Sequence, residues 1–147
     1  GFIAIDFATG ARKTVSGVIL SNSCDISSEN REDLPVNVLF APLIGLAKYM
    51  DRLREIGKTG TQIESIVGNI KKQRVTSLFY VPDCQGSIQE SIILLNDIHA
   101  HPLQDFLTRD HTSLFTLNQY AFYVFLIKLS IHFSRFQEDI QRFADAA

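Results

Sequence analysis

The stretch Val36-Asn-Val-Leu-Phe-Ala41 has the composition of a buried β-strand, and Pro35 stands directly before it. Branched and aromatic side chains of this kind are enriched in strands. Closer to the N-terminus, residues 1–7 (GFIAIDF) alternate apolar side chains onto one face, and residues 14–21 (TVSGVILS) contain a short apolar run. Both patterns are typical of strands, so the first part of the chain predicts a small sheet.

Two helices are predicted to follow, in an insert that covers residues 43–74. Apolar residues recur there at the spacing of a helix face, with charged residues between them. Gly57 is placed to end the first helix, because glycine readily adopts the left-handed conformation common at helix C-termini. Thr61 and Glu64 have the spacing of a capping box that starts the second helix, which is expected to end near Arg74.

The remaining residues predict more strands and one long helix. Strands are expected at 77–81 and 87–95, a strand or loop at 96–102, and a short strand at 113–117. A helix is expected from residue 118 to residue 144, with a continuous aromatic and aliphatic stripe. Its first half carries a second apolar face, which predicts burial on two sides, either against the helical insert or against a second subunit.

The length of 147 residues and the composition predict a single α+β domain over residues 1–147. The net charge of −2 gives no strong overall attraction to nucleic acid or membrane, and the most apolar run is too short to span a bilayer. Cys24 and Cys84 are expected to be reduced thiols of a cytoplasmic protein, with a single bridge between them as the alternative. The chain opens inside its first strand, so we expect further residues before Gly1.

The charges are unevenly distributed along the chain. Within residues 43–74, seven basic and three acidic residues give a net charge of +4, which leaves −6 for the rest. A basic helical pair can bind phosphate groups through the release of counterions, but it can equally be the ordinary solvated face of two helices. The candidate RNA-binding residues of this insert are Lys48, Arg52, Lys71, Lys72 and Arg74.

Cys24 and Asp25 follow the second predicted strand. A thiol beside a carboxylate can take part in nucleophilic or metal chemistry, although the adjacent anion disfavours the reactive thiolate. Asp25 and the neighbouring hydroxyl residues are also ordinary turn formers. Both interpretations stay open.

Asp97, His99 and His101 alternate, so a strand places all three on one face. Two histidines and a carboxylate can hold a metal ion or act as acid and base. A polar strand edge that faces solvent has the same pattern. We expect no metal or other cofactor, and we take Asp97 and His99 as candidate catalytic residues.

Several segments occur in an order that resembles the MazF/PemK-like toxin family of small SH3-like barrels. The matching pieces are Gly1-Phe-Ile-Ala-Ile-Asp-Phe7, Gly17-Val-Ile-Leu-Ser21-Asn22, Val36-Asn-Val-Leu-Phe-Ala-Pro42, Ile92-Ile-Leu-Leu-Asn-Asp-Ile98 and the segment from Leu114 to Leu129. The match covers most of the chain outside the insert. The resemblance implies a small SH3-like β-barrel, interrupted by the helical pair at 43–74 and closed by the long helix at 118–144.

Members of this family are typically dimeric, metal-independent endoribonucleases held inactive by an antitoxin. The resemblance therefore implies contact with RNA, in a toxin–antitoxin or defence system. Cleavage of this kind activates a ribose 2′-OH, and it needs an acid, a base and a cation. The resemblance implies that Arg12 or Lys13 holds the phosphate of the RNA. It implies that Asp25, His99 or Asp97 transfers the protons, with Cys24 beside them.

A second hypothesis is a non-catalytic interaction module on the same barrel. The family usually has an arginine directly before the second strand, where this chain has Val15 and Ser16. It also usually has a serine or threonine directly after the proline that corresponds to Pro42, where this chain has Leu43. Such a module would use the long aromatic helix to form a homodimer or to bind an antitoxin-like protein. The missing positions favour this hypothesis, whereas the clustered polar residues favour the first.

Overall fold

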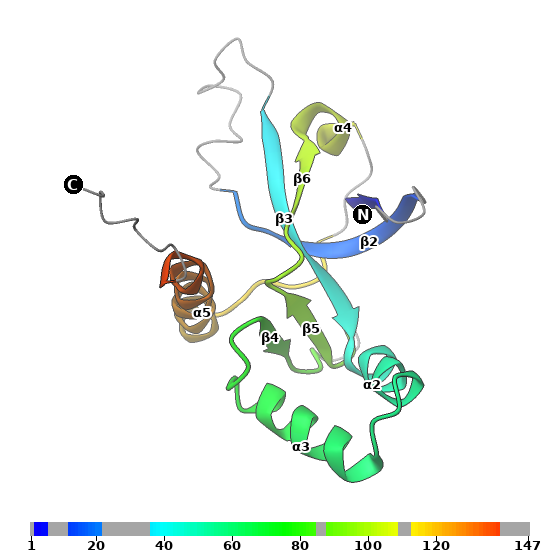
Figure 1. Cartoon of the computed structure of the whole chain (residues 1–147). Coiled ribbons are helices and arrows are strands. Elements are labelled where there is room, and N and C mark those ends of the chain that lie inside the picture. Colours follow the sequence, from blue (N-terminus) through cyan, green and yellow to red (C-terminus); the bar gives the residue numbers. More distant parts are fainter. Residues whose placement is uncertain (1, 6–11, 22–35, 85–87, 109–112, 139–147) are drawn as a thin grey trace, which may run out of the picture.

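The computed structural model describes residues 2–5, 12–21, 36–84, 88–108 and 113–138 of the chain (Figure 1). In this part the protein is a mixed α+β fold, as predicted, with six strands in one antiparallel sheet and four helices. The strands are β1 (Phe2–Ile5), β2 (Arg12–Ile19), β3 (Asn37–Gly45), β4 (Leu78–Val81), β5 (Ser91–Leu94) and β6 (His99–Pro102). The helices are α2 (Leu46–Glu55), α3 (Gly60–Lys71), α4 (Leu103–Leu107) and α5 (Gln119–Glu138).

The long strand β3 is the centre of the sheet, whose strand order is β1-β2-β3-β5-β4 with β6 also paired to β3. One edge of β3 pairs with β2. The other edge pairs with β6 along its first half and with β5 along its last residues. Phe40 therefore lies opposite both Ile19 and His99. This one strand connects the upper and lower parts of the molecule in Figure 1.

Pro42 explains why two separate strands share one edge of β3. Backbone groups of successive residues point to opposite edges of a strand, and the carbonyl of Leu39 points to β2, where it accepts a 2.8 Å bond from the N–H of Leu20. Three residues further on, Pro42 faces the opposite edge, where it has no N–H to donate. The turn at residues 95–98 leaves the ladder at this point, between β5 and β6.

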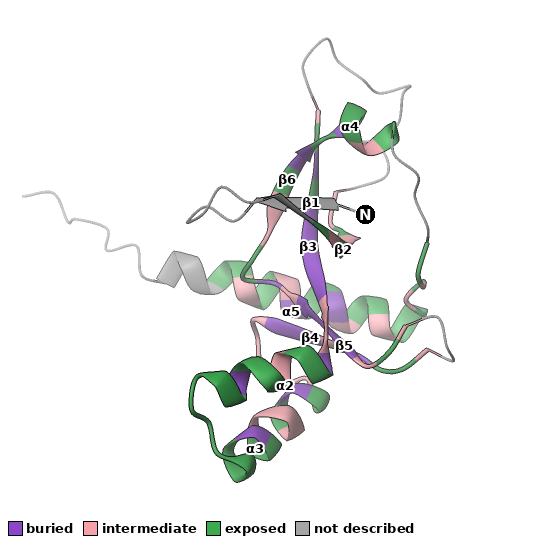
Figure 2. Cartoon of the chain, turned by 90° about the vertical axis from the view of Figure 1, so that its right-hand side faces the viewer, coloured by how far each residue is buried: buried purple, intermediate pink, exposed green. Residues whose placement is uncertain are grey.

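The sheet is open, and the predicted SH3-like barrel is not confirmed. β1 and β4 stand at its two ends, and no ladder joins them within the described residues. Around β4 and β5, α5 covers one face while α2 and α3 cover the other (Figures 1 and 2). Helices thus bury apolar side chains of both faces, whereas a closed barrel encloses only one face of its sheet in its interior.

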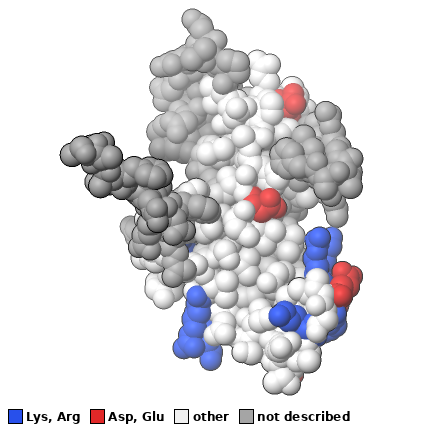
Figure 3. Space-filling model, viewed as in Figure 1, with Lys and Arg blue, Asp and Glu red and all other residues white. Residues whose placement is uncertain are grey.

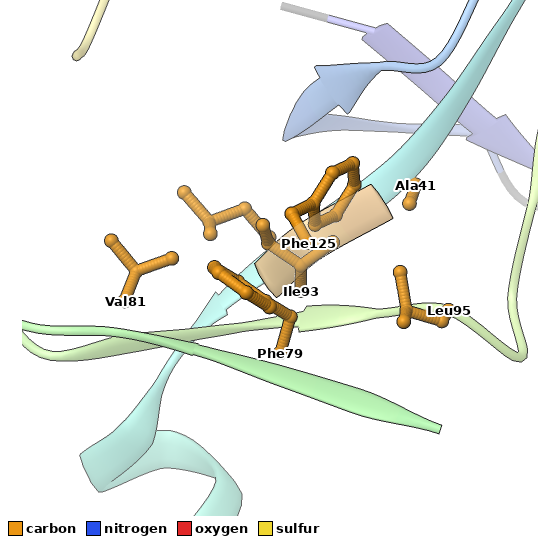
Figure 4. Packing of buried hydrophobic residues seen from close by; sticks show 7 residues of the cluster. Ala41, Phe79, Val81, Ile93, Leu95 and Phe125 are labelled. Carbon is orange, nitrogen blue, oxygen red and sulfur yellow. The ribbon is translucent and has the colours of Figure 1, made fainter. Parts of the chain in front are cut away.

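The main core lies between the sheet and α5 (Figure 4). Phe125 of α5 is 4% exposed, and its ring meets that of Phe79 edge-on with the centroids 5.1 Å apart. This packing holds the long helix on the sheet. The buried members of the cluster are Ala41, Leu43, Phe79, Val81, Ile93, Leu95 and Phe125.

Two further cores are built around the other parts of β3. Val38 and Phe40 pack against Leu103 of α4. At the opposite end of β3, a second buried cluster joins α2 and α3 to β4 and β5. Its members are Leu46, Ile70, Leu78 and Ile92.

β3 continues past Pro42, where the sequence predicted the start of a helix. Leu43 pairs with Ile93 of β5, and α2 begins only at Leu46. The helical spacing of Leu43 and Leu46 is therefore coincidental: the first packs in the core under α5, and the second packs in the core of α2 and α3. Strand pairing, which single-residue spacing does not reveal, decides this boundary.

Gly57 ends α2, as predicted. It has a φ of 84°, and its N–H donates to the carbonyl of Arg54 at 2.9 Å. The N–H of Lys58 donates to the carbonyl of Leu53 at 3.0 Å. These two bonds are those of a Schellman motif, in which glycine takes the left-handed position.

The capping box of α3 is formed by Thr59 and Gln62, so the prediction of Thr61 and Glu64 is wrong. The N–H of Gln62 donates to the Thr59 hydroxyl at 3.4 Å, and the N–H of Thr59 donates to the Gln62 side chain at 3.0 Å. Thr61 lies within the first turn of the helix instead.

Thr59→Ala is expected to lower the free energy of unfolding by about 1 kcal/mol, because it removes the side chain that accepts from the first turn. Thr61→Ala is the matched control, since Thr61 is exposed in that same turn, and it is expected to change stability by less than about 0.5 kcal/mol. Urea denaturation followed by circular dichroism measures both. A larger loss for Thr61→Ala would contradict the assignment.

The C-terminal third differs from the prediction at three places. Residues 113–117 form no strand, and the short helix α4 was not predicted. α5 begins at Gln119, one residue after the predicted start, and it is described as far as Glu138. Residues 139–144 of the predicted helix lie outside the described part.

Candidate functional site

Four of the predicted site residues have side chains outside the described part of the chain. Cys24 and Asp25 lie there entirely. For Arg12 and Lys13 the structure describes the backbone, which pairs with Ile5 and with the residue before it in β1. The phosphate-binding role of Arg12 or Lys13 and the proton-transfer role of Asp25 therefore stay predictions. Cys84, in the described part, is a free thiol.

Asp97 and His99 are brought together. Nε2 of His99 lies 2.9 Å from Oδ1 of Asp97, which is an ion-pair distance when the imidazole is protonated. The direction is not that of a hydrogen bond, and Nε2 has no hydrogen-bond partner among the described residues. The ring of His99 also stacks on Phe40, with centroids 5.4 Å apart, and its side chain is only 17% exposed. The position of His99 is therefore fixed by packing on Phe40 as well as by its proximity to Asp97.

His101 is buried beside the core of β3, opposite Val38. Its Nε2 also lacks a hydrogen-bond partner in the part of the chain that the structure describes. β6 places the two histidines on one face, as predicted, whereas Asp97 precedes the strand. No group of three or more His, Cys, Asp or Glu side chains among residues 36–84, 88–108 and the other described segments is placed to hold a metal ion.

The predicted RNA-binding residues lie on two different parts of the helical insert. Lys48 and Arg52 are exposed on α2, and Lys71, Lys72 and Arg74 are exposed at the end of α3. Figure 3 shows basic side chains in separate groups on this face, with acidic atoms beside one of them. The face in view carries no single continuous basic surface.

Glu90 connects α3 to the sheet. Its Oε1 accepts from Nζ of Lys71 at 2.6 Å and from the hydroxyl of Tyr80 at 2.5 Å. The hydrogen bonds from Lys71 and then Tyr80 lower the pKa of Glu90. Burial, followed by the bond to Glu90, raises the pKa of Tyr80 to about 12. The hydroxyl therefore stays protonated at ordinary pH, and the cluster joins elements rather than supplying a base.

Lys128 is buried on the inner side of α5, with 6% of its surface exposed. Its Nζ donates to the carbonyl of Leu78 and, at 2.8 Å, to Oε1 of Gln73. Burial lowers the pKa of Lys128 from 10.5 to about 8, because the charged form loses its hydration. No role was predicted for Lys128, although a lysine at helical spacing within an apolar stripe is a signal of a buried amine that needs hydrogen-bond partners.

The opposite side of α5 is strongly apolar and exposed, and we call it the outer face of α5. Its large side chains are between 41% and 79% exposed. Figure 2 shows exposed stretches alternating with buried and partly buried ones along this helix. The outer face consists of Tyr120, Phe122, Tyr123, Leu126, Ile127, Ile131 and Phe133.

The sequence predicted two apolar faces on this helix, but the structure covers only one of them. Phe125, with half-buried Val124 and Leu129, packs on the sheet, and the helical insert does not cover the other face. No helix in the described part of the chain is long and apolar enough to cross a membrane.

No protein family, curated protein or solved structure matches this chain. The fold is that of an α+β domain with an open antiparallel sheet, and its outer face of α5 is apolar and exposed.

Proposed function

We propose that this chain is a non-catalytic interaction module that pairs with a second copy of itself through the outer face of α5. The observation that carries the proposal is the exposure of seven large apolar side chains along one helix. Contiguous apolar surface of this extent is unusual on a monomer and marks interaction sites.

The size of this face fits a stable interface. If each large apolar side chain has roughly 200 Å² of surface, the exposed fractions of the seven amount to about 750 Å². A standard protein–protein interface buries about 800 Å² on each partner. The outer face alone therefore supplies most of the area that a dimer needs.

The direction of the face is set by helix geometry. At about 100° per residue, the side opposite the buried Phe125 and Lys128 is centred on Tyr123 and Ile127. Ser130 and Ser134 continue this line with small side chains, which allow a second helix to approach closely.

The charge of the face favours a second copy over another partner. Residues 119–134 contain a single lysine or arginine and no acid, and that lysine, Lys128, directs its amine into the protein. A neutral surface gives an acidic or basic partner nothing to complement, whereas two copies meet without repulsion. An isologous pair would bury the same patch on both subunits.

Sedimentation equilibrium of the full chain tests the proposal, and a dimer is expected at concentrations of about 10 µM. Ile127→Glu places a charge at the centre of the outer face and is expected to weaken pairing by about 100-fold or more. Ile56→Glu is the matched control, because this isoleucine is 67% exposed beyond the end of α2. A chain that stays monomeric up to about 100 µM would refute the proposal.

The proximity of Asp97 and His99 favours a second candidate, a MazF/PemK-like domain with an SH3-like barrel that contacts and cleaves RNA. These are the two predicted catalytic side chains that the described residues bring together. The test is incubation with single-stranded and structured RNA, with and without a chelator. Cleavage that His99→Ala abolishes would support this candidate, and the absence of both cleavage and salt-sensitive binding would remove it.

A further inference from the structure

β4 is the last strand of the sheet, and its outer edge carries the backbone groups of Leu78 and Tyr80. The inner edge pairs with β5, where the N–H of Leu95 donates to the carbonyl of Ser77 at 2.9 Å. Because backbone groups alternate between the two edges, the N–H and C=O groups of Leu78 and Tyr80 point away from β5. An edge of this kind pairs with other chains unless something covers it.

Gln73 covers the edge at Tyr80. Its Nε2 donates to the carbonyl of Tyr80 at 2.8 Å, and its Oε1 accepts from the N–H of Tyr80 at 3.2 Å. The carboxamide thus takes the place of a peptide group in a neighbouring strand. With a φ of 58°, Gln73 stands in the left-handed position after α3, where glycine is most common. The two side-chain bonds offset the unfavourable backbone conformation.

Lys128 covers the same edge at Leu78, because its Nζ donates to that carbonyl. It also donates to Oε1 of Gln73, so this one oxygen accepts from both Tyr80 and Lys128. The lysine belongs to α5, and the amine therefore joins the long helix to the edge of the sheet.

Both oxygens that accept from this amine are neutral, and Nζ also lies 5.8 Å from the centroid of the Phe79 ring. No carboxylate forms an ion pair with it in the described residues. Glu90 is engaged by Lys71 and Tyr80 instead. The described titratable and charged groups on α3, on β4 and its flanking residues, before β5 and on α5 are Glu64, Lys71, Lys72, Arg74, Tyr80, Asp83, Glu90, Tyr120, Tyr123 and His132.

We propose that Lys128 is a pH-dependent latch, whose neutral amine holds α5 on the edge of β4 more tightly than its charged ammonium does. A buried ammonium loses its hydration and gains no opposite charge, whereas a neutral amine keeps an N–H donor at a much smaller desolvation cost. This inference concerns the inner side of α5, and it holds whether or not the outer face pairs.

Stability is expected to rise with pH above the folded-state pKa of about 8 and below the unfolded value of 10.5. Below this window both states carry the charge, so the folded state bears the full desolvation penalty. Within it, the folded state has released the proton while the unfolded state still binds it, and stability therefore increases. Tyr80, with its pKa of about 12, stays protonated throughout this range.

Urea unfolding tests the latch, and the unfolding equilibrium constant is expected to fall about 20-fold between about pH 7.5 and about pH 9.5. Lys128→Met is expected to lose most of this dependence. Repeating both measurements with Ile127→Ser separates the latch from the pairing of two copies, because that variant shortens an exposed apolar side chain of the outer face and adds no charge beside Lys128. Parallel pH profiles for the unaltered chain and for Lys128→Met would overturn the proposal.

A second measurement applies even where Lys128→Met does not fold. The ¹³C chemical shift of Cε in Lys128 follows the titration of the amine in the unaltered chain. A midpoint near the folded-state value of about 8 is expected, and a midpoint near 10.5 would show that the amine is not desolvated and would overturn the latch.

Discussion

Phe125→Ala is expected to lower the free energy of unfolding by about 3–5 kcal/mol, the typical loss for a buried phenylalanine. The ring is 4% exposed and meets Phe79 edge-on, and it fills the space between α5 and the sheet. Its removal leaves a cavity where the long helix is held most firmly. Chemical denaturation gives the free energy, and amide hydrogen exchange is expected to show faster opening of α5 than of α3.

Phe122→Ala is the matched control for this result. Phe122 stands on the same helix, three residues away, but it is 46% exposed. Its replacement is expected to change the free energy of unfolding of the monomer by less than about 1 kcal/mol. Equal losses for the two variants would contradict the assignment of an inner and an outer face.

Phe40→Ala is expected to have an effect of similar size, about 3–5 kcal/mol. Phe40 has no exposed surface, packs with Val38 and Leu103, and stacks on His99. The loss is expected to appear first as faster hydrogen exchange in β6, because His99 lies opposite Phe40 in the ladder. Denaturation and exchange measured on the same sample check both statements.

The neighbouring Leu39 supplies the control for Phe40. It lies on the same strand but is 44% exposed, so Leu39→Ala is expected to cost less than about 1 kcal/mol. A loss for Leu39→Ala as large as that for Phe40→Ala would mean that the two faces of β3 are not distinguished as described.

The sequence predicted most of the elements because their apolar patterns are local. Each of three signals can be recognised within a short stretch of sequence. They are the strand pattern at residues 36–41, the glycine after α2 and the aromatic stripe of α5. The end of β3 was not predicted, because Pro42 resembles the end of a strand. The strand can continue through Pro42 because this residue faces the edge where β5 and β6 leave a gap. That arrangement depends on long-range strand pairing.

The barrel was expected because the order of the segments resembles that of the MazF/PemK-like family, and closing a sheet is one way to bury one of its faces. Here α5, α2 and α3 serve that purpose, and spacing alone does not tell which face each helix covers. The same ambiguity applied to α5: its sequence showed two apolar faces, but only the sheet's position decides that Phe125 points inward and Ile127 outward.

The side-chain contacts that cover the edge of β4 were beyond prediction for a different reason. Gln73 and Lys128 lie 55 residues apart, and neither belongs to a recognisable motif. Two local signals existed: a lysine within an apolar stripe, and the lack of glycine after α3. Neither identifies a partner, because the partners are backbone groups of an edge strand.

Disulfide trapping tests the central claim, that two copies meet through the outer face of α5. Ser130 is exposed near the middle of α5, so the two copies of this residue are expected to lie close together in an antiparallel pair of helices. Ser65, exposed on α3, is the matched control. Each serine is replaced by cysteine in a separate variant, and both variants also carry Cys24→Ser and Cys84→Ser. Mild oxidation is expected to convert Ser130→Cys to a covalent dimer rapidly while Ser65→Cys remains monomeric, whereas equal yields, or faster trapping through Ser65→Cys, would contradict the account.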